Sequence, residues 1–356
     1  MEPESGLLLV DPSGSRWLSS RDLPDILGRL RTPQAPVTWL HAAVSDDLVA
    51  ALEAAGLHEL AVKSLRDGPE RPRVEEYPDH LYVSLLRARD GEALESASAA
   101  SARPAASAGP PAAAATGASP DASVDRHTIQ IEDIRVFLGS RWIISLGGLD
   151  QDELATVSAR VSRQVMERGR GPSFVLYYLA EWAVGTLYPL LDTLDDRVDS
   201  LEDLVLVDTG DTTRQELFRL KRDLAESRRR VAPTRDVMQR LSTHGLGFVE
   251  PGVEVFFRDV HDDVLLVLEQ LDTHRDILSS ALDLYLSTVS NRLNEVMKRL
   301  TVVATVFMPL TFITGFFGMN FVDLPVGSTA WYGLTLAGMV VLSAAMVGYA
   351  WRRRWL

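Results

Sequence analysis

The residues best suited to chemistry lie on one face of a C-terminal stretch that runs from Asp283 to Asn320. Alternating steps of four and three residues join side chains that are mostly small or polar: Asp283, Ser287, Ser290, Asn294, Met297, Thr301, Ala304, Met308, Thr311, Gly315 and Gly318. We call this set the polar stripe. Its mean spacing of ~3.5 residues is typical of helices that supercoil around like neighbours. Such a face could pack against another helix, or it could line a water-filled path for ions.

The polar stripe enters an apolar segment, residues 301–317, in which no side chain is charged. This length is at the short end of the ~17–25 residues that cross a bilayer as a helix. Lys298 and Arg299 precede the segment, and the loop that follows contains no Lys or Arg. The positive-inside rule therefore predicts a cell-membrane protein with both termini in the cytoplasm. We expect transmembrane helices over 300–318 and 330–350, an extracytoplasmic loop over 319–329 and a basic cytoplasmic tail over 351–356.

The elements upstream must position these spans. Residues 1–250 predict a cytoplasmic α/β domain with a helical hairpin. The expected strands are 37–40, 82–86, 127–131 and 142–146, and the expected helices are 46–56, capped by Ser45 or Asp46, then 174–207 and 212–241. A segment rich in Ala, Ser, Pro and Gly, about 93–125, interrupts this region. It has too few large apolar residues to offset its ordering entropy, so we expect a flexible insertion across which the sheet continues.

From residue 251 onward, apolar side chains recur at helical spacing, and no helix breaker precedes Pro309. We therefore expect a stalk helix over 251–299 that continues into the first span, as one helix from about 253 to 317. The predicted fold class is an α+β membrane protein, in which a cytoplasmic α/β domain is followed by a long stalk helix continuous with the first of two transmembrane helices.

Composition narrows the classes of function. The net charge of −13 argues against a nucleic-acid partner, which would need a basic face. The sequence has no cysteine, which excludes disulfides and thiolate metal sites. It contains no GxxxxGK phosphate loop, no GxSxG elbow and no HExxH pair among its seven histidines. We therefore expect neither an enzyme nor a resident cofactor.

Two spans cannot enclose a pore, so a pore would need several copies around a central axis, with the polar stripe facing that axis. The loop after the first span would then form the outer mouth. There Gly318 exposes backbone carbonyls, Asn320 offers an amide oxygen, and the helix C-terminus adds partial negative charge. These groups suit Mg²⁺, which keeps its waters. The membrane potential would draw each charge inward with ~2.3 kcal/mol per 100 mV.

The end of this stretch resembles the most characteristic run of the CorA family of divalent-cation transporters, which closes on a glycine-methionine-asparagine triplet. The similar residues are 290–298, 300–301, 308–311 and 315–321, with further similarity upstream at 71–77, 228–233 and 257–260. The resemblance covers nearly the whole chain except the insertion.

The resemblance implies a homopentamer with a cytoplasmic funnel and a central pore lined by the first span. The partners of each chain would be its own copies, the lipid bilayer and divalent cations. The implied selectivity ring is Gly318, Met319 and Asn320. Together with the polar stripe, the resemblance assigns the pore lining and gate to Asp283, Asn294, Met297, Leu300, Thr301, Ala304, Met308, Thr311 and Gly315. Arg352, Arg353 and Arg354 match the basic collar of the family.

The chain departs from the family pattern in two places. Phe317 stands where tyrosine is usual before the triplet. The family also senses internal magnesium through carboxylates between neighbouring subunits. Asp259 matches one side of that regulatory site, but Lys63 and Ser64 stand where the family commonly has Glu-Asp. We therefore expect closure by internal Mg²⁺ to need higher concentrations than in relatives with both carboxylates.

Three functions remain open at this point. The leading one is passive influx of Mg²⁺, with Co²⁺ and Ni²⁺ as further candidate ions. Another is zinc transport by a member of the same superfamily, which shares the triplet and the helical hairpin. A third, of a different class, is a non-conducting scaffold or sensor tethered to the membrane, in which the polar stripe only packs helices.

Overall fold

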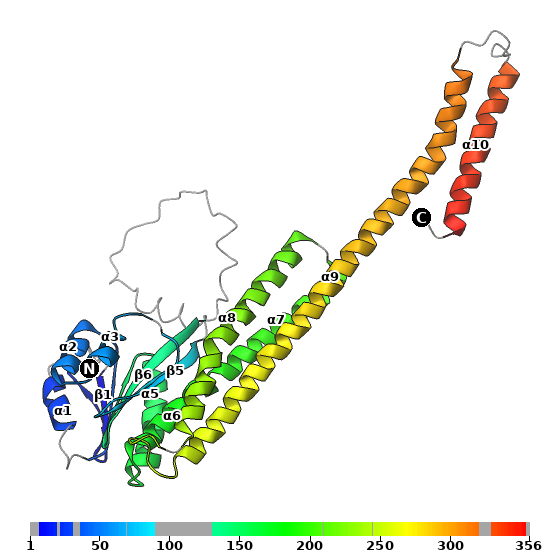
Figure 1. The fold of residues 1–356 in the computed structure, drawn as a ribbon. Helices are drawn as coiled ribbons and strands as arrows, with labels where there is room; N and C mark the ends of the chain where they lie inside the picture. The colour runs from blue at the N-terminus through cyan, green and yellow to red at the C-terminus, as the bar shows by residue number, and fades with distance from the viewer. Residues whose placement is uncertain are drawn as a thin grey trace, which may run out of the picture. The chain divides into compact units, whose positions relative to one another are not determined.

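The computed structural model describes residues 7–19, 22–30, 36–68, 70–89, 130–208, 210–243, 245–319 and 329–353. The chain divides into two compact units (Figure 1). The N-terminal unit comprises Met1–Ser200 and Gln215–Leu278, and the C-terminal unit comprises Leu201–Arg214 and Ser279–Leu356.

The N-terminal unit is built on a mixed sheet that has seven strands in the described residues, in the order β2-β1-β3-β7-β6-β5-β4. The strands are β1 (Leu7–Asp11), β2 (Gly14–Leu18), β3 (Thr38–Ala42), β4 (Val74–Glu76), β5 (Leu81–Arg89), β6 (Gln130–Leu138) and β7 (Trp142–Leu146). β3 and β7 pair in parallel, and the other neighbours are antiparallel. The α/β prediction for this region is confirmed.

β5 and β6 pair along their whole length, from Leu81 opposite Leu138 to Arg89 opposite Gln130. The prediction that the sheet continues across the insertion is therefore confirmed. The insertion itself, about 93–125, lies outside the described residues, as do residues 127–129 of the predicted strand.

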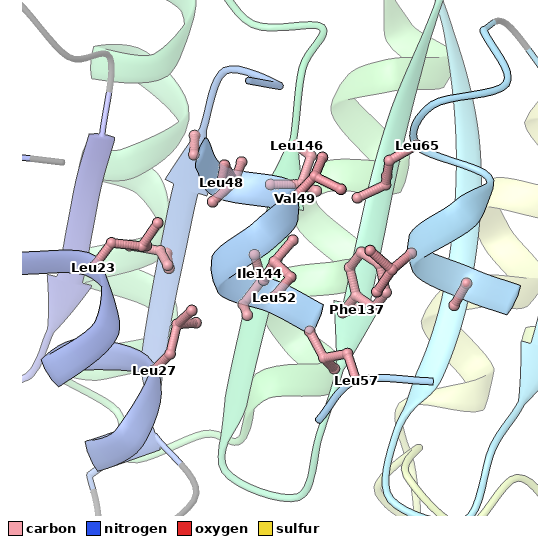
Figure 2. Close-up of a cluster of buried hydrophobic side chains, with 14 of the residues drawn as sticks. Leu23, Leu27, Leu48, Val49, Leu52, Leu57, Leu65, Phe137, Ile144 and Leu146 are labelled. Atoms are coloured by element: carbon pink, nitrogen blue, oxygen red, sulfur yellow. The ribbon is translucent and has the colours of Figure 1, made fainter. Parts of the chain in front are cut away.

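One face of the sheet is covered by α1 (Leu23–Leu30), α2 (Asp46–Ala54) and α3 (Glu59–Lys63). Leu27 and Leu52 from these helices meet Phe137 and Ile144 from the strands in one buried cluster (Figure 2). As predicted, Ser45 caps α2: its hydroxyl accepts a hydrogen bond from the Leu48 amide at 3.2 Å.

The other face of the sheet packs against α6 (Pro172–Gly185), which follows α5 (Gln151–Val161) and a π-helical turn, η3 (Ser162–Met166). Alternate strand residues reach the two faces, because side chains along a strand point to opposite sides. Both faces are therefore apolar, and the strands are buried nearly throughout, except for β2 and β4 at the edges.

The stretch predicted as one helix over 174–207 is helical, as Pro172–Val207, but a single turn residue, Thr186, divides it into two helices. The chain forms α6, ends it at Gly185, and starts α7 (Leu187–Val207) two residues later. Pro189 explains the break, since it lacks the amide that would bond the Gly185 carbonyl and its ring would crowd that carbonyl. Thr186 at the junction donates its hydroxyl proton to the Ala183 carbonyl at 2.6 Å and accepts from the Ala88 amide at 2.9 Å. The partner helix of the hairpin, α8 (Asp211–Leu241), agrees with the predicted 212–241.

The longest element is α9 (Glu254–Phe317), a single helix of 64 residues that includes Pro309. This confirms the prediction of a stalk helix continuous with the first apolar segment. The last helix is α10 (Thr329–Arg352).

The described residues contain three helical stretches long and apolar enough to cross a membrane: Pro172–Val207, Glu254–Phe317 and Gly333–Arg352. Sequence analysis named only the last two. More than half of the apolar window in Pro172–Val207 is buried inside the protein, whereas the windows in the other two are almost wholly uncovered. Packing on the sheet thus accounts for the apolar character of the first stretch.

Candidate functional site

Every residue of the polar stripe lies in the C-terminal unit, on α9 except for Gly318 just after its end, and every one is exposed in the single chain. The large side chains assigned to the gate are among the most open on the helix: Met297 is 52%, Leu300 61% and Met308 73% exposed. A large uncovered apolar side chain on a helix end that can span a membrane needs either lipid or protein as its environment.

The shielded face of α9 is a different one. In the apolar segment it consists of Val302, Val306, Pro309, Leu310 and Ile313, and Val302 is buried. This face is turned toward α10, because Val302 and Val306 line a crevice with Ala345, Met346, Tyr349 and Ala350 of α10. At ~100° of rotation per residue, it lies roughly 160° around the helix from the polar stripe. Within one chain, therefore, α10 covers the back of α9 and leaves the polar stripe open.

Each threonine of the polar stripe donates its hydroxyl proton to a backbone carbonyl of its own helix. Thr301 donates to the Met297 carbonyl at 2.8 Å, and Thr311 donates to the Phe307 carbonyl at 2.9 Å. A hydroxyl has one proton and two lone pairs, so each of these oxygens now presents only acceptor capacity to whatever faces it. The waters around a cation point their protons outward, so they need hydrogen-bond acceptors and not donors.

The predicted selectivity ring begins at the end of α9. The Gly318 amide donates to the Thr314 carbonyl at 2.9 Å and the Met319 amide to the Phe316 carbonyl at 3.3 Å, which closes the last turn. A Cβ atom on Gly318 would lie 3.1 Å from the Thr314 oxygen, so a side chain there would crowd the helix end. Asn320, the third member of the ring, lies outside the described residues.

The predicted basic collar follows α10. Arg352 is the last residue of that helix, and the Arg353 guanidinium lies 5.7 Å from the centre of the Tyr349 ring. Arg354 lies outside the described residues. Since α9 and α10 run in opposite directions, these arginines and the Lys298–Arg299 pair lie at the same end of the helix pair.

The residues predicted to regulate the protein lie in the N-terminal unit. Asp259 is exposed on α9. One turn further on, burial raises the pKa of Asp263, and the nearby charge of Asp259 adds to that effect, against a hydrogen bond from the Tyr188 hydroxyl. The described residues contain no group of three or more His, Asp and Glu side chains placed to hold a metal ion.

Lys63 and Ser64 differ in a way that the sequence did not reveal. Lys63 is exposed at the end of α3, but Ser64 is buried. The Ser64 hydroxyl donates to the Ala61 carbonyl at 2.8 Å and lies 3.1 Å from the Tyr82 hydroxyl. An acidic side chain at 64 would therefore be placed in the core, and only position 63 could present one at the surface.

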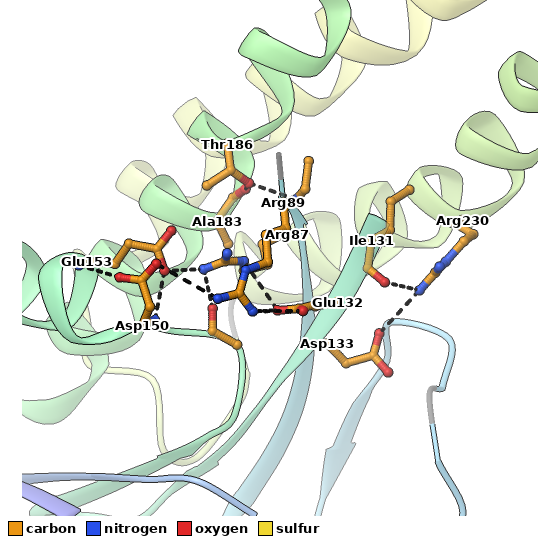
Figure 3. Close-up of polar contacts among 12 residues, drawn as sticks. Arg87, Arg89, Ile131, Glu132, Asp133, Asp150, Glu153, Ala183, Thr186 and Arg230 are labelled. Carbon is orange, nitrogen blue, oxygen red and sulfur yellow. Dashed lines mark hydrogen bonds and ion pairs between the residues drawn. The ribbon is translucent and has the colours of Figure 1, made fainter. Parts of the chain in front are cut away.

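Sequence analysis also missed a buried polar network beside β5 and β6 (Figure 3). Arg87, only 1% exposed, donates to the Gly148 carbonyl and to Glu153, and its guanidinium stacks 5.2 Å from the Trp182 ring. Arg89 pairs with Glu132 at 3.1 Å. The clue was an arginine in an apolar strand pattern, which requires a buried partner. These contacts tie the sheet to α5 and α6 and make the network structural.

Taken together, the fold defines a class: an α/β domain followed by a long helix that continues as the first of two apolar helices of membrane-spanning length. Residues 90–353 match the family described as CorA-like Mg²⁺ transporter protein. The chain belongs to this family, which confirms the family assignment made from the sequence.

Relatives and solved structures agree with this assignment. The chain is 31% identical over 304 residues to the cobalt/magnesium transport protein CorA of Thermotoga maritima, covering 85% of this chain and 77% of the relative. It is also 28% identical over 239 residues to the zinc transport protein ZntB of Pectobacterium carotovorum, covering 64% and 69%. The complete structure of the CorA magnesium transporter from Methanocaldococcus jannaschii superimposes with a TM-score of 0.73 at 19% identity, covering 98% of each chain. The last comparison bears on the fold alone.

Proposed function

We propose that this protein carries Mg²⁺ into the cell, down its electrochemical gradient, through a central pore formed by several copies of the chain. Co²⁺ and Ni²⁺ are further candidate ions. In this proposal the protein lies in the cell membrane with both termini in the cytoplasm. The observation that carries the proposal is the position of the polar stripe on α9, opposite the face that α10 covers.

Polar groups at membrane depth face protein or a water-filled cavity, because lipid offers them no hydrogen bonds. α10 cannot cover the polar stripe within the same chain, so the covering groups must come from elsewhere. Copies of α9 around a common axis supply them, and the 3.5-residue period of the polar stripe suits such an arrangement. A count of five copies rests on membership of the family.

The polar stripe also fits the ion. Mg²⁺ dehydrates reluctantly, so a path for it should bind its waters rather than the bare ion. Thr301 and Thr311 present acceptor oxygens to those waters, and Asn294 adds an amide oxygen without a full charge. Binding through uncharged side chains and bridging waters is weak enough for the ion to be released. The exposed Met297, Leu300 and Met308 would close the path by dewetting.

Zinc transport is the second candidate, and the similarity to ZntB is the observation that favours it. Zn²⁺ prefers nitrogen and sulfur ligands, often from histidine or cysteine. The stretch from Asp283 to Asn320 contains neither residue. The composition of the polar stripe therefore favours Mg²⁺ over Zn²⁺.

The test is uptake by the full-length protein in liposomes, with a dye that reports internal Mg²⁺ and a competing panel of Co²⁺, Ni²⁺ and Zn²⁺. Thr311→Val keeps the shape of the side chain and removes its acceptor oxygen, and we expect it to slow uptake by about tenfold, the equivalent of one hydrogen bond of ~1.4 kcal/mol. Thr335→Val is the matched control, because the Thr335 hydroxyl also donates to a carbonyl of its own helix at a half-buried position, but on α10.

Uptake that Thr311→Val and Asn320→Ala leave unchanged would contradict a pore along the polar stripe. Uptake of Zn²⁺ in preference to Mg²⁺ would support the second candidate. If the reconstituted protein moves no divalent ion, the non-conducting scaffold is the better description.

A further inference from the structure

A crevice lies between α9 and α10 on the side of α9 that faces away from the polar stripe. It has a volume of about 270 Å³ and is lined almost entirely by apolar groups. Its walls are Val302, Thr305 and Val306 from α9 and Ala345, Met346, Tyr349 and Ala350 from α10. On the α9 side, the hydroxyl group that lines the crevice is that of Thr305. It donates its proton to the Thr301 carbonyl at 2.7 Å, so it needs no acceptor within the crevice.

The crevice arises because α10 presents small side chains where α9 presents branched ones. Ala345 and Ala350 leave a space that the neighbouring Met346 and Tyr349 border but do not close. A water molecule takes up about 30 Å³ in the liquid, and a methylene group is of similar size, so there is room for several methylenes. An apolar crevice of this kind offers water few partners, so its walls would gain dispersion contacts from an apolar chain that filled it.

The crevice lies at the cationic end of the helix pair. Lys298 and Arg299 come about one helical turn before Val302, and Arg352 and Arg353 come within a turn after Ala350. In the described segments 291–319 and 329–353, Glu295 is the sole carboxylate, and it is paired with Arg299. The entrance of an apolar crevice thus has an excess of positive charge at the depth where a bilayer places its phosphates.

We propose that this crevice is a binding site for one anionic phospholipid. One acyl chain fills the space between Val302, Val306 and Ala345, and the phosphate is held by Arg352 and Arg353 with Lys298 beside them. Arginine suits this task, because its planar donors match phosphate oxygens in pairs. The cation–π contact from Arg353 to Tyr349 directs one guanidinium toward the crevice wall. The inference shares with the proposed function only the placement of α9 and α10 in a bilayer.

The test measures lipid binding rather than transport. The full-length protein in mild detergent is stripped of lipid and then titrated with phosphatidylglycerol or phosphatidylcholine in mixed micelles, and bound lipid is counted by native mass spectrometry. We expect one phosphatidylglycerol per chain to be retained with an affinity at least tenfold above that for phosphatidylcholine. Glycerol phosphate, which has the headgroup charge without the acyl chains, should not displace it.

Two kinds of variant separate the crevice from the charges. Ala345→Phe fills the crevice and should abolish the retained lipid, whereas Val341→Phe, at a position 67% exposed on α10, should not. Arg352→Gln combined with Arg353→Gln should lower phosphatidylglycerol affinity by about 25-fold, at roughly fivefold per charge. Arg240→Gln, on α8 in the N-terminal unit, is the charge control.

Equal affinity for the two lipids would overturn the inference, and so would unchanged binding in the double arginine variant. Retention that survives Ala345→Phe would show that the lipid is elsewhere. A protein that conducts Mg²⁺ but shows no lipid preference would defeat this inference alone. One that binds phosphatidylglycerol but moves no ion would defeat the proposed function alone.

Discussion

Arg89 and Gln130 face each other at the end of the described pairing between β5 and β6, although residues 90–129 separate them in the sequence. The ends of the two strands are therefore already within the reach of a tight hairpin turn. The sheet needs no length of chain between them, and the whole stretch is an addition to a hairpin.

We accordingly predict that replacing residues 90–129 by Asn-Gly leaves the fold and ion uptake intact. Asn-Gly is the preferred two-residue hairpin turn. Shortening the loop reduces the closure entropy and should raise the free energy of unfolding by about 3 kcal/mol at most. Thermal unfolding in detergent and the liposome assay check both expectations.

The control replaces residues 90–130 by the same Asn-Gly turn, which shifts the register by one residue. It should destabilise the sheet, since it turns the apolar side chains of β6 to the wrong face. Equal loss of folding in both deletions would contradict the prediction.

The buried network around Arg87 should be essential for stability. Arg87→Met keeps the apolar volume but leaves Glu153 and the Gly148 carbonyl without their buried donor. Breaking one partner of a buried pair costs about 3 kcal/mol or more. Chemical denaturation of the full-length protein measures the change. The matched control is Arg229→Met, which removes an exposed pair with Glu226 and should cost less than about 1 kcal/mol. A loss in Arg87→Met no larger than that of the control would refute the assignment.

The pH dependence of stability should include a contribution from His41. Burial lowers the pKa of His41 from 6.5 to about 4. Its Nδ1 lies 2.9 Å from the Ser145 hydroxyl, which also accepts a hydrogen bond from the Trp39 indole at 2.9 Å. Because the ring takes up a proton more readily when unfolded than when folded, its contribution is complete above pH 6.5 and falls as the pH drops toward 4. The total is about 3 kcal/mol.

His41→Asn should remove this dependence while it keeps an acceptor near Ser145. The quantity to measure is the slope of unfolding free energy against pH from 7 to 4, in the parent protein and the variant. Carboxylates titrate in the same window, so the difference between the two slopes isolates His41. Parallel slopes would show that His41 is protonated equally in both states.

Regulation by internal Mg²⁺ can be tested at position 63. The resemblance assigns Asp259 to one side of an inhibitory site, and Lys63 is the exposed position on the other. We expect Lys63→Glu to lower the Mg²⁺ concentration that halves ion current, by about tenfold or more, since it exchanges a repelling charge for an attracting one. The same change in an Asp259→Ala background should have little effect. Ser64→Asp is unsuitable, because it would bury a carboxylate beside Tyr82. A midpoint that neither Lys63→Glu nor Asp259→Ala alters would place the sensor elsewhere.

Much of the fold could be predicted from local pattern. α2 was recognised from Ser45 and its apolar spacing, and α9 from the absence of any breaker before Pro309. The break between α6 and α7 was missed because a proline in the first turn of a helix is compatible with either a start or a kink. α3 has only five residues, too few to show a helical period, and β2 has exposed, polar side chains that do not alternate as a half-buried strand should.

The candidate site could be predicted only in part. The period of the polar stripe identified one face of α9, but nothing in α9 itself says which face α10 covers, since that depends on packing between helices. Ser64 shows the same limit. Its neighbours in sequence look exposed, yet its hydroxyl is held by Tyr82 from a strand 18 residues away. The surroundings of a side chain are set by the tertiary fold, so they cannot be derived from the spacing of residues in the sequence.

The bonding of the stripe threonines has one more consequence. A proton can hop along a row of hydroxyls only if each group is free to rotate, releasing one proton as it takes another. Thr301 and Thr311 cannot do so, because each proton is fixed on a carbonyl of the preceding turn. In the proposed pore, these two hydroxyls would therefore supply no relay for hydrogen ions, and a metal ion could enter without a loss of the proton gradient through them.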